Sequence, residues 1–218
     1  MELSIMSKII VLTNQKGGCG KTTMTINLAG RFGKNAKVLV IDGDPQGTSS
    51  RWIASASELH PFPAAIANLS MVGNKAHKEI GKYAHDYDYI FVDCPPAVEN
   101  NFTDSVLLIA DLVIVPIIPS PADLWAAVGI QKLITKVETF NETLKSRLLA
   151  NMCQSNTSIS REASELINDF GIQKFKTEIY QRTSYRKAAA SGSIVHDLDD
   201  KKAKNEIDLL KEEILQIL

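Results

Sequence analysis

The chain has 218 residues, of which 44% are hydrophobic and 22% are charged, and its formal net charge is −1. This composition is that of an ordinary globular protein, and the length suffices for one domain with a large shared core. The nearly balanced charge excludes a global attraction to nucleic acid, so any such binding must come from a local basic patch.

Cysteine usage and hydropathy exclude further classes. Cys19, Cys94 and Cys153 are far apart, odd in number and without a Cys-x-x-Cys pair, which argues against disulfide or metal use and fits a reducing cytoplasm. No run of about 18 apolar residues is present, so we expect no membrane span. We expect residues 1–6 to be a disordered extension without a signal-peptide pattern, and the chain, 1–218, to form a single domain.

The first predicted elements flank a glycine-rich segment. A β-branched apolar run, Ile9–Leu12, predicts a strand, and Met24–Phe32 has a helical pattern. Between them lies the sequence N-Q-K-G-G-C-G-K-T-T, residues 14–23. Strand, glycine-rich turn and helix form the architecture of a phosphate-binding loop, in which backbone N–H groups and the helix dipole face a phosphate chain. We expect Lys21 at the β- and γ-phosphates and the Thr22 hydroxyl on Mg²⁺.

The spacing of this loop departs from the general G-x-x-x-x-G-K-[ST] pattern, because Gln15 stands at the first glycine position and Lys16 follows it. A lysine at each end of the loop, K-G-G-x-G-K-T-T, resembles the deviant Walker A motif of the ParA/MinD family of ATPases. The alternative is a glycine-rich turn without a ligand, but the ordered motif between a predicted strand and helix favours nucleotide binding. The predicted phosphate contacts are Lys16, Gly17, Gly18, Cys19, Gly20, Lys21, Thr22 and Thr23.

A second motif follows the predicted buried strand Lys37–Ile41. Residues 42–46 read D-G-D-P-Q, and carboxylates at the carboxyl end of a strand beside a phosphate loop are placed to act on the γ-phosphate side. A solvated Asp-Pro turn is the alternative. The sequence D-x-D-P-Q resembles the family's second motif, which implies that Asp44 orients or activates the attacking water and that Asp42 and Asp44 belong to the metal shell.

The segment after this motif is rich in small residues. Residues 47–57 resemble the family's first switch, and within them we expect Trp52 to be a core anchor. The sequence then predicts a helix over residues 64–69 and an amphipathic surface helix over residues 75–85.

The next predicted strand, Tyr87–Asp93, is an apolar run that ends in an aspartate and is followed by C-P-P. This order has the form of the Walker B motif, in which Asp93 would hold Mg²⁺ through a water. We expect Cys94 to be a packed small residue, because no Cys/His pairing is apparent. Residues 97–101 are expected to form the second switch.

The carboxyl-terminal half continues the alternation of strands and helices. After a predicted strand over residues 111–116, a proline-bearing loop leads into a helix over residues 122–140. In the family this region lies near the dimer interface, but a loop that only needs stiffness explains the prolines equally well. The strand over residues 147–152 ends where the family's adenine-contacting segment lies, so the resemblance implies that Asn151 and Met152 line the base pocket. The remaining predicted elements are a helix over residues 160–170, a short strand over residues 175–179 and a helix over residues 203–218.

These elements predict the fold class. Five α/β repeats with short connections are typical of an α/β protein with a doubly wound, mainly parallel sheet flanked by helices, which is the architecture of the P-loop NTPases.

A basic segment lies near the carboxyl terminus. Residues 174–187 carry five basic side chains against one acid, Glu178, a local charge of +4, with Tyr180 and Tyr185 among them. Such a segment can bind a phosphate backbone without reading bases, although most charge runs are only solvated faces. In the ParA family, non-specific DNA binding by the ATP-bound dimer maps to basic residues in this third of the chain. The resemblance therefore implies DNA contacts by Lys174, Lys176, Arg182, Arg186 and Lys187.

The predicted last helix separates two branches of the family. MinD-type relatives end in a basic amphipathic helix that inserts into a membrane. Here Ile207, Leu210, Ile214 and Ile217 form an apolar stripe, but acids offset the lysines and no Trp or Phe is present, unlike an interfacial anchor. We expect this helix to pack against the core, without a membrane partner.

The resemblance extends over nearly the whole chain from Met6 and is nearest to the short plasmid-partition ParA proteins of the ParF type. It implies a Mg²⁺-dependent ATPase that hydrolyses ATP to ADP and phosphate and is stimulated by a small ParB-like adaptor. Lys16 would reach the phosphates of a second subunit in a homodimer, so Lys16, Lys21 and Asp44 are the expected catalytic residues. The protein would be cytoplasmic, bind nucleoid DNA non-specifically, and segregate or position a plasmid, a chromosome or a protein cargo.

Other functional classes share these motifs. A MinD-like positioning ATPase is one, and an ATP-dependent metabolic enzyme of the same loop class is another, although nothing in the sequence marks its additional substrate pocket. An electron-transfer ATPase resembling the nitrogenase iron protein needs two cluster-ligating cysteines, and Cys94 with Cys153 does not match its pattern.

Overall fold

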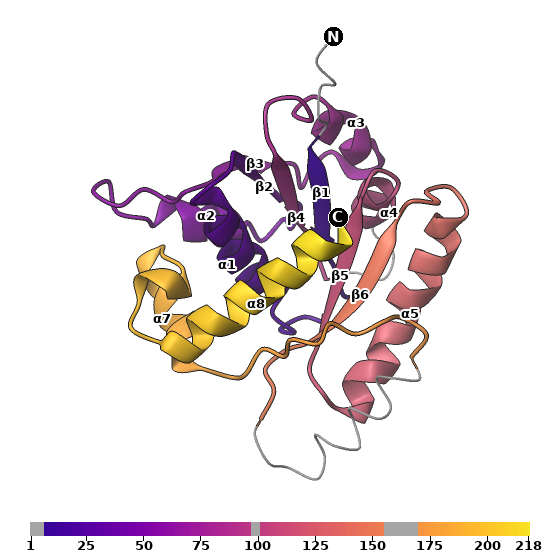
Figure 1. Cartoon of the computed structure of the whole chain (residues 1–218). Coiled ribbons are helices and arrows are strands. Elements are labelled where there is room, and N and C mark those ends of the chain that lie inside the picture. Colours follow the sequence, from indigo (N-terminus) through magenta and orange to yellow (C-terminus); the bar gives the residue numbers. More distant parts are fainter. Residues whose placement is uncertain (1–6, 97–100, 155–169) are drawn as a thin grey trace.

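The computed structural model describes residues 7–96, 101–154 and 170–218. Its strands form a six-stranded, all-parallel sheet in the order β3-β2-β4-β1-β5-β6 (Figure 1). The four central strands are almost completely buried, as expected of apolar strands covered on both faces. The strands are β1 (Lys8–Leu12), β2 (Val38–Asp42), β3 (Ala65–Asn68), β4 (Tyr89–Asp93), β5 (Leu112–Ile117) and β6 (Lys145–Ala150).

Helices cover both faces of the sheet, which confirms the predicted doubly wound fold. In β1, Ile9 and Val11 pack on one side while Ile10 and Leu12 pack on the other, the two-residue alternation of a strand. One face carries α1, α7 and α8, and the opposite face carries α3, α4 and α5 (Figure 1). The α-helices are α1 (Lys21–Gly33), α2 (Thr48–Ala54), α3 (Ala76–Gly81), α4 (Asn101–Leu107), α5 (Pro121–Glu138), α7 (Thr183–Ser191) and α8 (Lys201–Ile217).

The strand register brings three predicted motifs to one edge of the sheet. Leu12 at the end of β1 and Asp42 at the end of β2 both pair with Asp93 at the end of β4. Because the strands are parallel, the phosphate loop, the D-G-D-P-Q turn and the Asp93 side chain all lie at the carboxyl ends. This is the edge at which open α/β sheets bind their ligands.

The predicted helix over residues 64–69 is wrong. Ala65–Asn68 forms the edge strand β3 and pairs in parallel with Leu39–Asp42 of β2, because strand pairing at a sheet edge overrides the helix propensity of alanine. The helix predicted over residues 75–85 is shorter than expected, with α3 ending at Gly81.

The predicted short strand over residues 175–179 is also wrong. Only single bridges form, at Lys174 and Tyr180. The N–H groups of Lys176 and Thr177 instead donate to the carboxylate of Glu213 in α8, at 2.8 and 2.7 Å. A side chain from the closing helix thus takes donors that a regular ladder would use.

The closing helix packs against the core, as predicted. Ile207, Leu210 and Ile214 are fully buried, and α8 crosses α1 (Figure 1). Trp52 is 6% exposed, as expected of a core anchor, and its indole N–H donates to Ser193 O at 2.9 Å. None of the described helices is long and apolar enough to cross a membrane. The predictions for residues 1–6, 97–100 and 160–169 fall outside the described residues.

Candidate functional site

The phosphate loop is held in shape by buried amide side chains at the ends of β1 and β6. Asn14 is 1% exposed; its Nδ2 donates to Pro116 O at 2.7 Å, and its Oδ1 accepts the Lys16 N–H at 3.1 Å. Asn151, just after β6, donates to Cys19 O at 2.7 Å. Within this frame Gly17 is exposed. A braced loop with exposed glycine backbone suits close approach of a phosphate group.

Gly20 joins the loop to α1 and is a position that only glycine can fill. Its φ of 93° is left-handed, and a Cβ there would lie 2.2 Å from Asn151 Nδ2. The junction therefore needs glycine for its backbone and for the space that Asn151 occupies. Asn151, predicted as a base contact, also braces the phosphate loop.

Lys21 is folded over the loop and is 7% exposed. Its Nζ donates to Lys16 O at 3.0 Å and lies 4.0 Å from Cys19 Sγ. An ammonium held there, without a carboxylate partner among the described side chains, is available to an anion bound in the loop. Burial raises the pKa of the Cys19 thiol, so Cys19 is a packed neutral side chain and not a nucleophile.

Asp93 lies beside Thr22 and is 1% exposed. Its Oδ2 accepts hydrogen bonds from Thr22 Oγ1 and from Ser49 Oγ, both at 2.7 Å. Its Oδ1 is buried and has no hydrogen-bond partner within the described ranges. Burial raises the pKa of Asp93 to about 6. A buried carboxylate with one unsatisfied oxygen beside a threonine hydroxyl fits a Mg²⁺ site.

Asp42 and Asp44 shape the turn after β2. Asp42 is fully buried; its Oδ2 accepts the Ser50 N–H at 2.8 Å and the Ser50 hydroxyl at 2.6 Å, and its Oδ1 accepts the Asp44 N–H at 3.2 Å. Asp44 is half-buried and accepts the Gln46 N–H at 2.9 Å. The Asp42 carboxylate thus anchors the start of α2, while Asp44 lies in the turn itself.

The four predicted metal residues do not form a full protein ligand set. Across residues 7–96, 101–154 and 170–218, no three acidic, histidine or cysteine side chains converge to hold a metal ion. Thr22 and Asp93 are the predicted pair that the structure brings into direct contact. This arrangement suits Mg²⁺, which usually keeps waters and substrate phosphates as its other ligands.

Lys16, at the opening of the loop, is paired with its own chain. Its Nζ lies 2.7 Å from Asp123 Oδ1, and the Asp123 side chain is 7% exposed while the Lys16 side chain is 39% exposed. Ser120 caps α5 by accepting the Asp123 N–H at 3.2 Å. A buried carboxylate in the first turn of α5 therefore holds the lysine that the sequence predicts to cross to a second subunit.

A cavity of about 200 Å³ lies between α1, the end of β6 and α7. Asn151 and Met152 both line it, as their predicted role in the base pocket requires, and Met152 has a φ of 55°, a strained value for a side chain of its size. Tyr180 and Tyr185 also line this cavity, and aromatic side chains are suited to contact a planar base.

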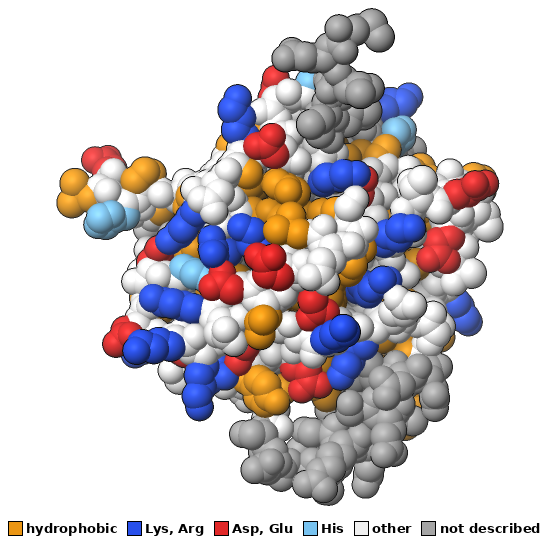
Figure 2. Space-filling view, viewed as in Figure 1, with side chains coloured by type: hydrophobic (Ala, Val, Ile, Leu, Met, Phe, Trp, Pro, Cys, Tyr) orange, Lys and Arg blue, Asp and Glu red, His pale blue; other side chains and the backbone are white. Residues whose placement is uncertain are grey.

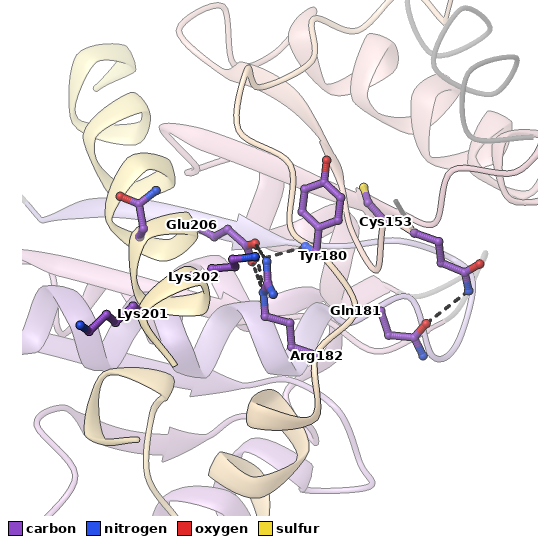
Figure 3. Close-up of a pocket in the computed structure, with 9 residues that line it drawn as sticks. Cys153, Tyr180, Gln181, Arg182, Lys201, Lys202 and Glu206 are labelled. Carbon is purple, nitrogen blue, oxygen red and sulfur yellow. Dashed lines mark hydrogen bonds and ion pairs between the residues drawn. The ribbon is translucent and has the colours of Figure 1, made fainter. Parts of the chain in front are cut away.

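A larger, open groove of about 820 Å³ adjoins this cavity (Figure 3). Tyr180, Gln181 and Arg182 line both. Within the groove, the Arg182 guanidinium forms an ion pair with Glu206 of α8, and the Arg182 Nε lies 3.1 Å from Glu206 Oε1 (Figure 3). Lys201 and Lys202, in the first turn of α8, complete the basic side chains of the groove.

The predicted DNA-binding residues differ in their surroundings. Arg182 is paired with Glu206, and Lys174 is paired with Glu178 at 2.8 Å. The other three are exposed, namely Lys176, Arg186 and Lys187. Basic and acidic side chains alternate over α8 and its surroundings on the face shown in Figure 2, without a continuous basic patch.

Comparison with known proteins decides the family. The domain described as "CobQ/CobB/MinD/ParA nucleotide binding domain" matches residues 10–195. The chain belongs to the CobQ/CobB/MinD/ParA family. This confirms the resemblance to ParA/MinD proteins that the phosphate loop predicts.

Several relatives of this ParA/MinD domain are similar along nearly their whole length. This chain is 27% identical over 208 residues to the maintenance of carboxysome distribution protein A of Halothiobacillus neapolitanus, and the match covers 94% of this chain and 95% of the relative. It is 26% identical over 252 residues to the sporulation initiation inhibitor protein Soj of Bacillus subtilis, covering 95% and 98%.

Solved structures share the fold of this ParA/MinD domain. The ATP complex of a Cyanothece McdA variant has a TM-score of 0.82 at 17% identity, covering 95% of this chain and 96% of that chain. The cobyrinic acid a,c-diamide synthase of Mycobacterium smegmatis, bound to an ATP analogue and magnesium, has a TM-score of 0.68 at 22% identity, covering 85% and 91%. One of these homologous structures holds ATP and the other holds an ATP analogue with magnesium, which agrees with the two cofactors that the sequence predicts, ATP and Mg²⁺.

Several residues of this ParA/MinD site were not among the predicted site residues. Ser49 reaches Asp93 from α2, Asp123 reaches Lys16 from α5, and Glu206 reaches Arg182 from α8. Ser49 lies in the predicted first switch, and Asp123 follows the proline-bearing loop. The sequence therefore marked both segments, but it did not predict that Ser49 contacts Asp93 or that Asp123 contacts Lys16. Nothing local in the sequence marks Glu206.

Proposed function

We propose that this protein is a ParA-type positioning ATPase that dimerises around Mg·ATP, binds DNA non-specifically in that state and resets by hydrolysis. One observation carries the proposal: three motifs meet at the carboxyl edge of the sheet. The two-lysine loop follows β1, Asp44 follows β2, and Asp93 at the end of β4 contacts Thr22. Lys21 and Asp93 are both buried and neither forms an ion pair within the described ranges; buried ionisable groups of this kind are typical of ligand sites.

The proposed hydrolysis uses the residues at this edge in distinct roles. Lys21 and the loop amides would bind the phosphates. Thr22 directly and Asp93 through a water would hold Mg²⁺, which when bound would supply positive charge to the triphosphate. Asp44 orients the attacking water. Asp42 keeps the Asp44 turn in place through its hydrogen bonds to Ser50 and to the Asp44 N–H.

Dimerisation is proposed to depend on Lys16. Its ion pair with Asp123 holds the ammonium against α5, and the 39% exposure of the lysine side chain leaves it within reach of solvent. For Lys16 to contact the triphosphate of a second subunit, this ion pair must open. Binding of the second subunit's phosphates supplies the opposite charge that replaces Asp123.

DNA binding is proposed for the exposed cations around α7 and the start of α8. Arg186 and Lys187 are exposed on α7, and Lys201 and Lys202 are exposed at the groove. These side chains are free of carboxylate partners within the described part of the chain, so they can neutralise phosphates. Arg182 contributes less, because Glu206 already neutralises it.

The cargo and adaptor follow from the relatives only by analogy. One relative is named for carboxysome distribution, another is a chromosome-partitioning ATPase, and one solved structure is a plasmid partition protein. A protein assembly, a chromosome and a plasmid are therefore all candidate cargoes, reached through a small ParB-like adaptor. A MinD-like membrane anchor is disfavoured, because the apolar stripe of α8 is buried against the core.

The test of this proposal combines hydrolysis with DNA retardation. The purified protein should hydrolyse ATP only with Mg²⁺ and should retard a DNA fragment with ATP but not with ADP, and the retardation should weaken steeply as salt is raised. A protein without Mg²⁺-dependent hydrolysis would contradict the ATPase assignment. Equal retardation with ATP and ADP would contradict the nucleotide switch.

A further inference from the structure

Gly43 lies between Asp42 and Asp44, and an aromatic ring occupies the space where its side chain would be. A Cβ built on Gly43 would lie 2.2 Å from Phe102 Cε1 and 2.4 Å from Phe102 Cζ. Gly43 is not among the described glycines with a positive φ, so its backbone conformation does not require glycine. The ring of Phe102 is therefore the physical reason for a glycine at this position.

Neither side of this contact can move freely. The Gly43 N–H donates to Asp93 O at 2.9 Å, which ties Gly43 to the end of β4. Phe102 is 1% exposed and belongs to the core cluster between the sheet and the helices α3, α4 and α5. Close-packed interiors transmit a displacement at such a contact instead of absorbing it.

We propose that Phe102 is a positioning residue for Asp44 and acts through its packing against Gly43. The inference rests on the proposed ATPase, in which Asp44 orients the attacking water. The Asp44 N–H is held by Asp42 at 3.2 Å, and the ring on Gly43 sets the backbone position from which Asp44 starts. The location of α4, which carries Phe102 in its first turn, is thereby coupled to the geometry of the catalytic turn.

The test is a double-mutant cycle in ATP hydrolysis with the full chain. In Gly43→Ala the new methyl group and the ring must separate by about 1 Å, and a displacement of that size lowers kcat by about 10- to 100-fold. The dissociation constant of Mg·ATP, measured by calorimetry, should stay within about twofold, because the phosphate loop is untouched. Phe102→Leu in the Gly43→Ala background makes room for the methyl group and should restore kcat to within about threefold of the wild type.

Gly30→Ala is the matched control. A Cβ at Gly30 would lie 2.5 Å from Ile194 Cγ2, so this variant is crowded by an apolar side chain in the same way but lies in α1, away from Asp44. It should lower the thermal midpoint while leaving kcat unchanged. A loss of kcat in Gly30→Ala equal to that in Gly43→Ala would overturn the proposal, because crowding alone would then explain both.

Two further outcomes separate the inference from the proposed function. If the wild type hydrolyses ATP and either Gly43→Ala keeps its full rate or the double variant is no faster than Gly43→Ala, the positioning role of Phe102 is refuted alone. If the wild type does not hydrolyse ATP, the proposed function fails and the inference fails with it. Should Gly43→Ala not fold, Phe102→Leu alone decides, since losing the ring that packs on Gly43 should lower kcat without changing Mg·ATP affinity, and an unchanged kcat overturns the proposal.

Discussion

The phosphate-loop edge and the basic carboxyl-terminal segment are both charged, but their charges are compensated differently. At the loop edge, Lys21 and Asp93 are buried, and their partners are a backbone carbonyl and two hydroxyls. In the carboxyl-terminal segment, Arg182 and Lys174 are each paired with a carboxylate. The first arrangement leaves charge for a ligand to satisfy, whereas the second satisfies the charge within the fold.

The contrast between these two regions shows that the partner of a charged side chain indicates whether the side chain serves a ligand or the fold. Burying a charge without a counter-charge is costly, so it persists where a ligand compensates it. A partly buried ion pair needs no ligand, and breaking it leaves the other charge unpaired. The charge of Arg182, which is predicted to bind DNA, is already compensated by Glu206. We therefore expect the exposed Lys201 and Lys202 to contribute more to phosphate contacts.

The largest expected effect is at the loop edge. Asp44→Ala removes the group that we propose to orient the attacking water, so kcat should fall by at least about 100-fold while Mg·ATP still binds. Steady-state hydrolysis and calorimetry measure the two quantities, and Asp86→Ala, a change of an exposed aspartate, is the control. Wild-type turnover in Asp44→Ala would show that Asp44 has been given the wrong role.

The next effect concerns Arg182. Arg182→Ala leaves Glu206, whose side chain is 11% exposed, without its guanidinium partner, so the free energy of unfolding should fall by about 2 kcal/mol. Urea denaturation measures this change. Lys202→Ala, in which an exposed lysine is removed from the same groove, should leave stability nearly unchanged. Equal stability of the two variants would contradict the claim that Arg182 stabilises the fold through its ion pair while Lys202 does not.

The next prediction concerns DNA binding by the exposed lysines at the start of α8. The double variant Lys201→Ala, Lys202→Ala should bind DNA about tenfold more weakly with ATP, and the salt dependence should become shallower by about 1.8 in log–log slope, because two phosphate contacts are lost. Retardation over a salt series gives both values. Lys78→Ala, on the helix α3 of the opposite face, is the control. An unchanged slope in the double variant would remove these lysines from the proposed DNA surface.

The smallest expected effect is a pH dependence at Asp93. Its pKa is raised from 3.8 to about 6 by burial, so the folded protein binds more protons than the unfolded chain in this window. The stability contributed by protonated Asp93 is therefore present at low pH and lost as pH rises through about 6. Without Mg²⁺ and nucleotide, Asp93→Asn should gain thermal stability relative to the wild type as pH rises through this range.

Mg²⁺ binding should show the opposite preference. Protonated Asp93 has lost the negative charge that would hold a water of the Mg²⁺ ion, so Mg²⁺ affinity should decrease as Asp93 becomes protonated at low pH. Thermal unfolding and Mg²⁺ titration across this range measure both effects. A stability difference between Asp93→Asn and wild type that does not depend on pH would contradict the raised pKa.

The sequence predicts the loop edge well because each motif there is local. Strand, turn and helix around Lys21 follow one another in the chain, and the parallel register brings the ends of three strands together. The partners of these charges are not local: Asp123 and Glu206 come from helices far along the chain. Strand β3 was also missed, because its pairing with β2 is decided by the sheet and not by the propensity of its alanines.

The most direct test of the account is sedimentation of the wild type and of Lys16→Ala with Mg²⁺ and a slowly hydrolysed ATP analogue. The account predicts that the wild type changes from monomer to dimer when nucleotide is added, while Lys16→Ala binds the nucleotide and stays monomeric. A wild type that stays monomeric when saturated, or a Lys16→Ala variant that dimerises as well as the wild type, would contradict the central claim that two lysines bind the triphosphate jointly with a second subunit.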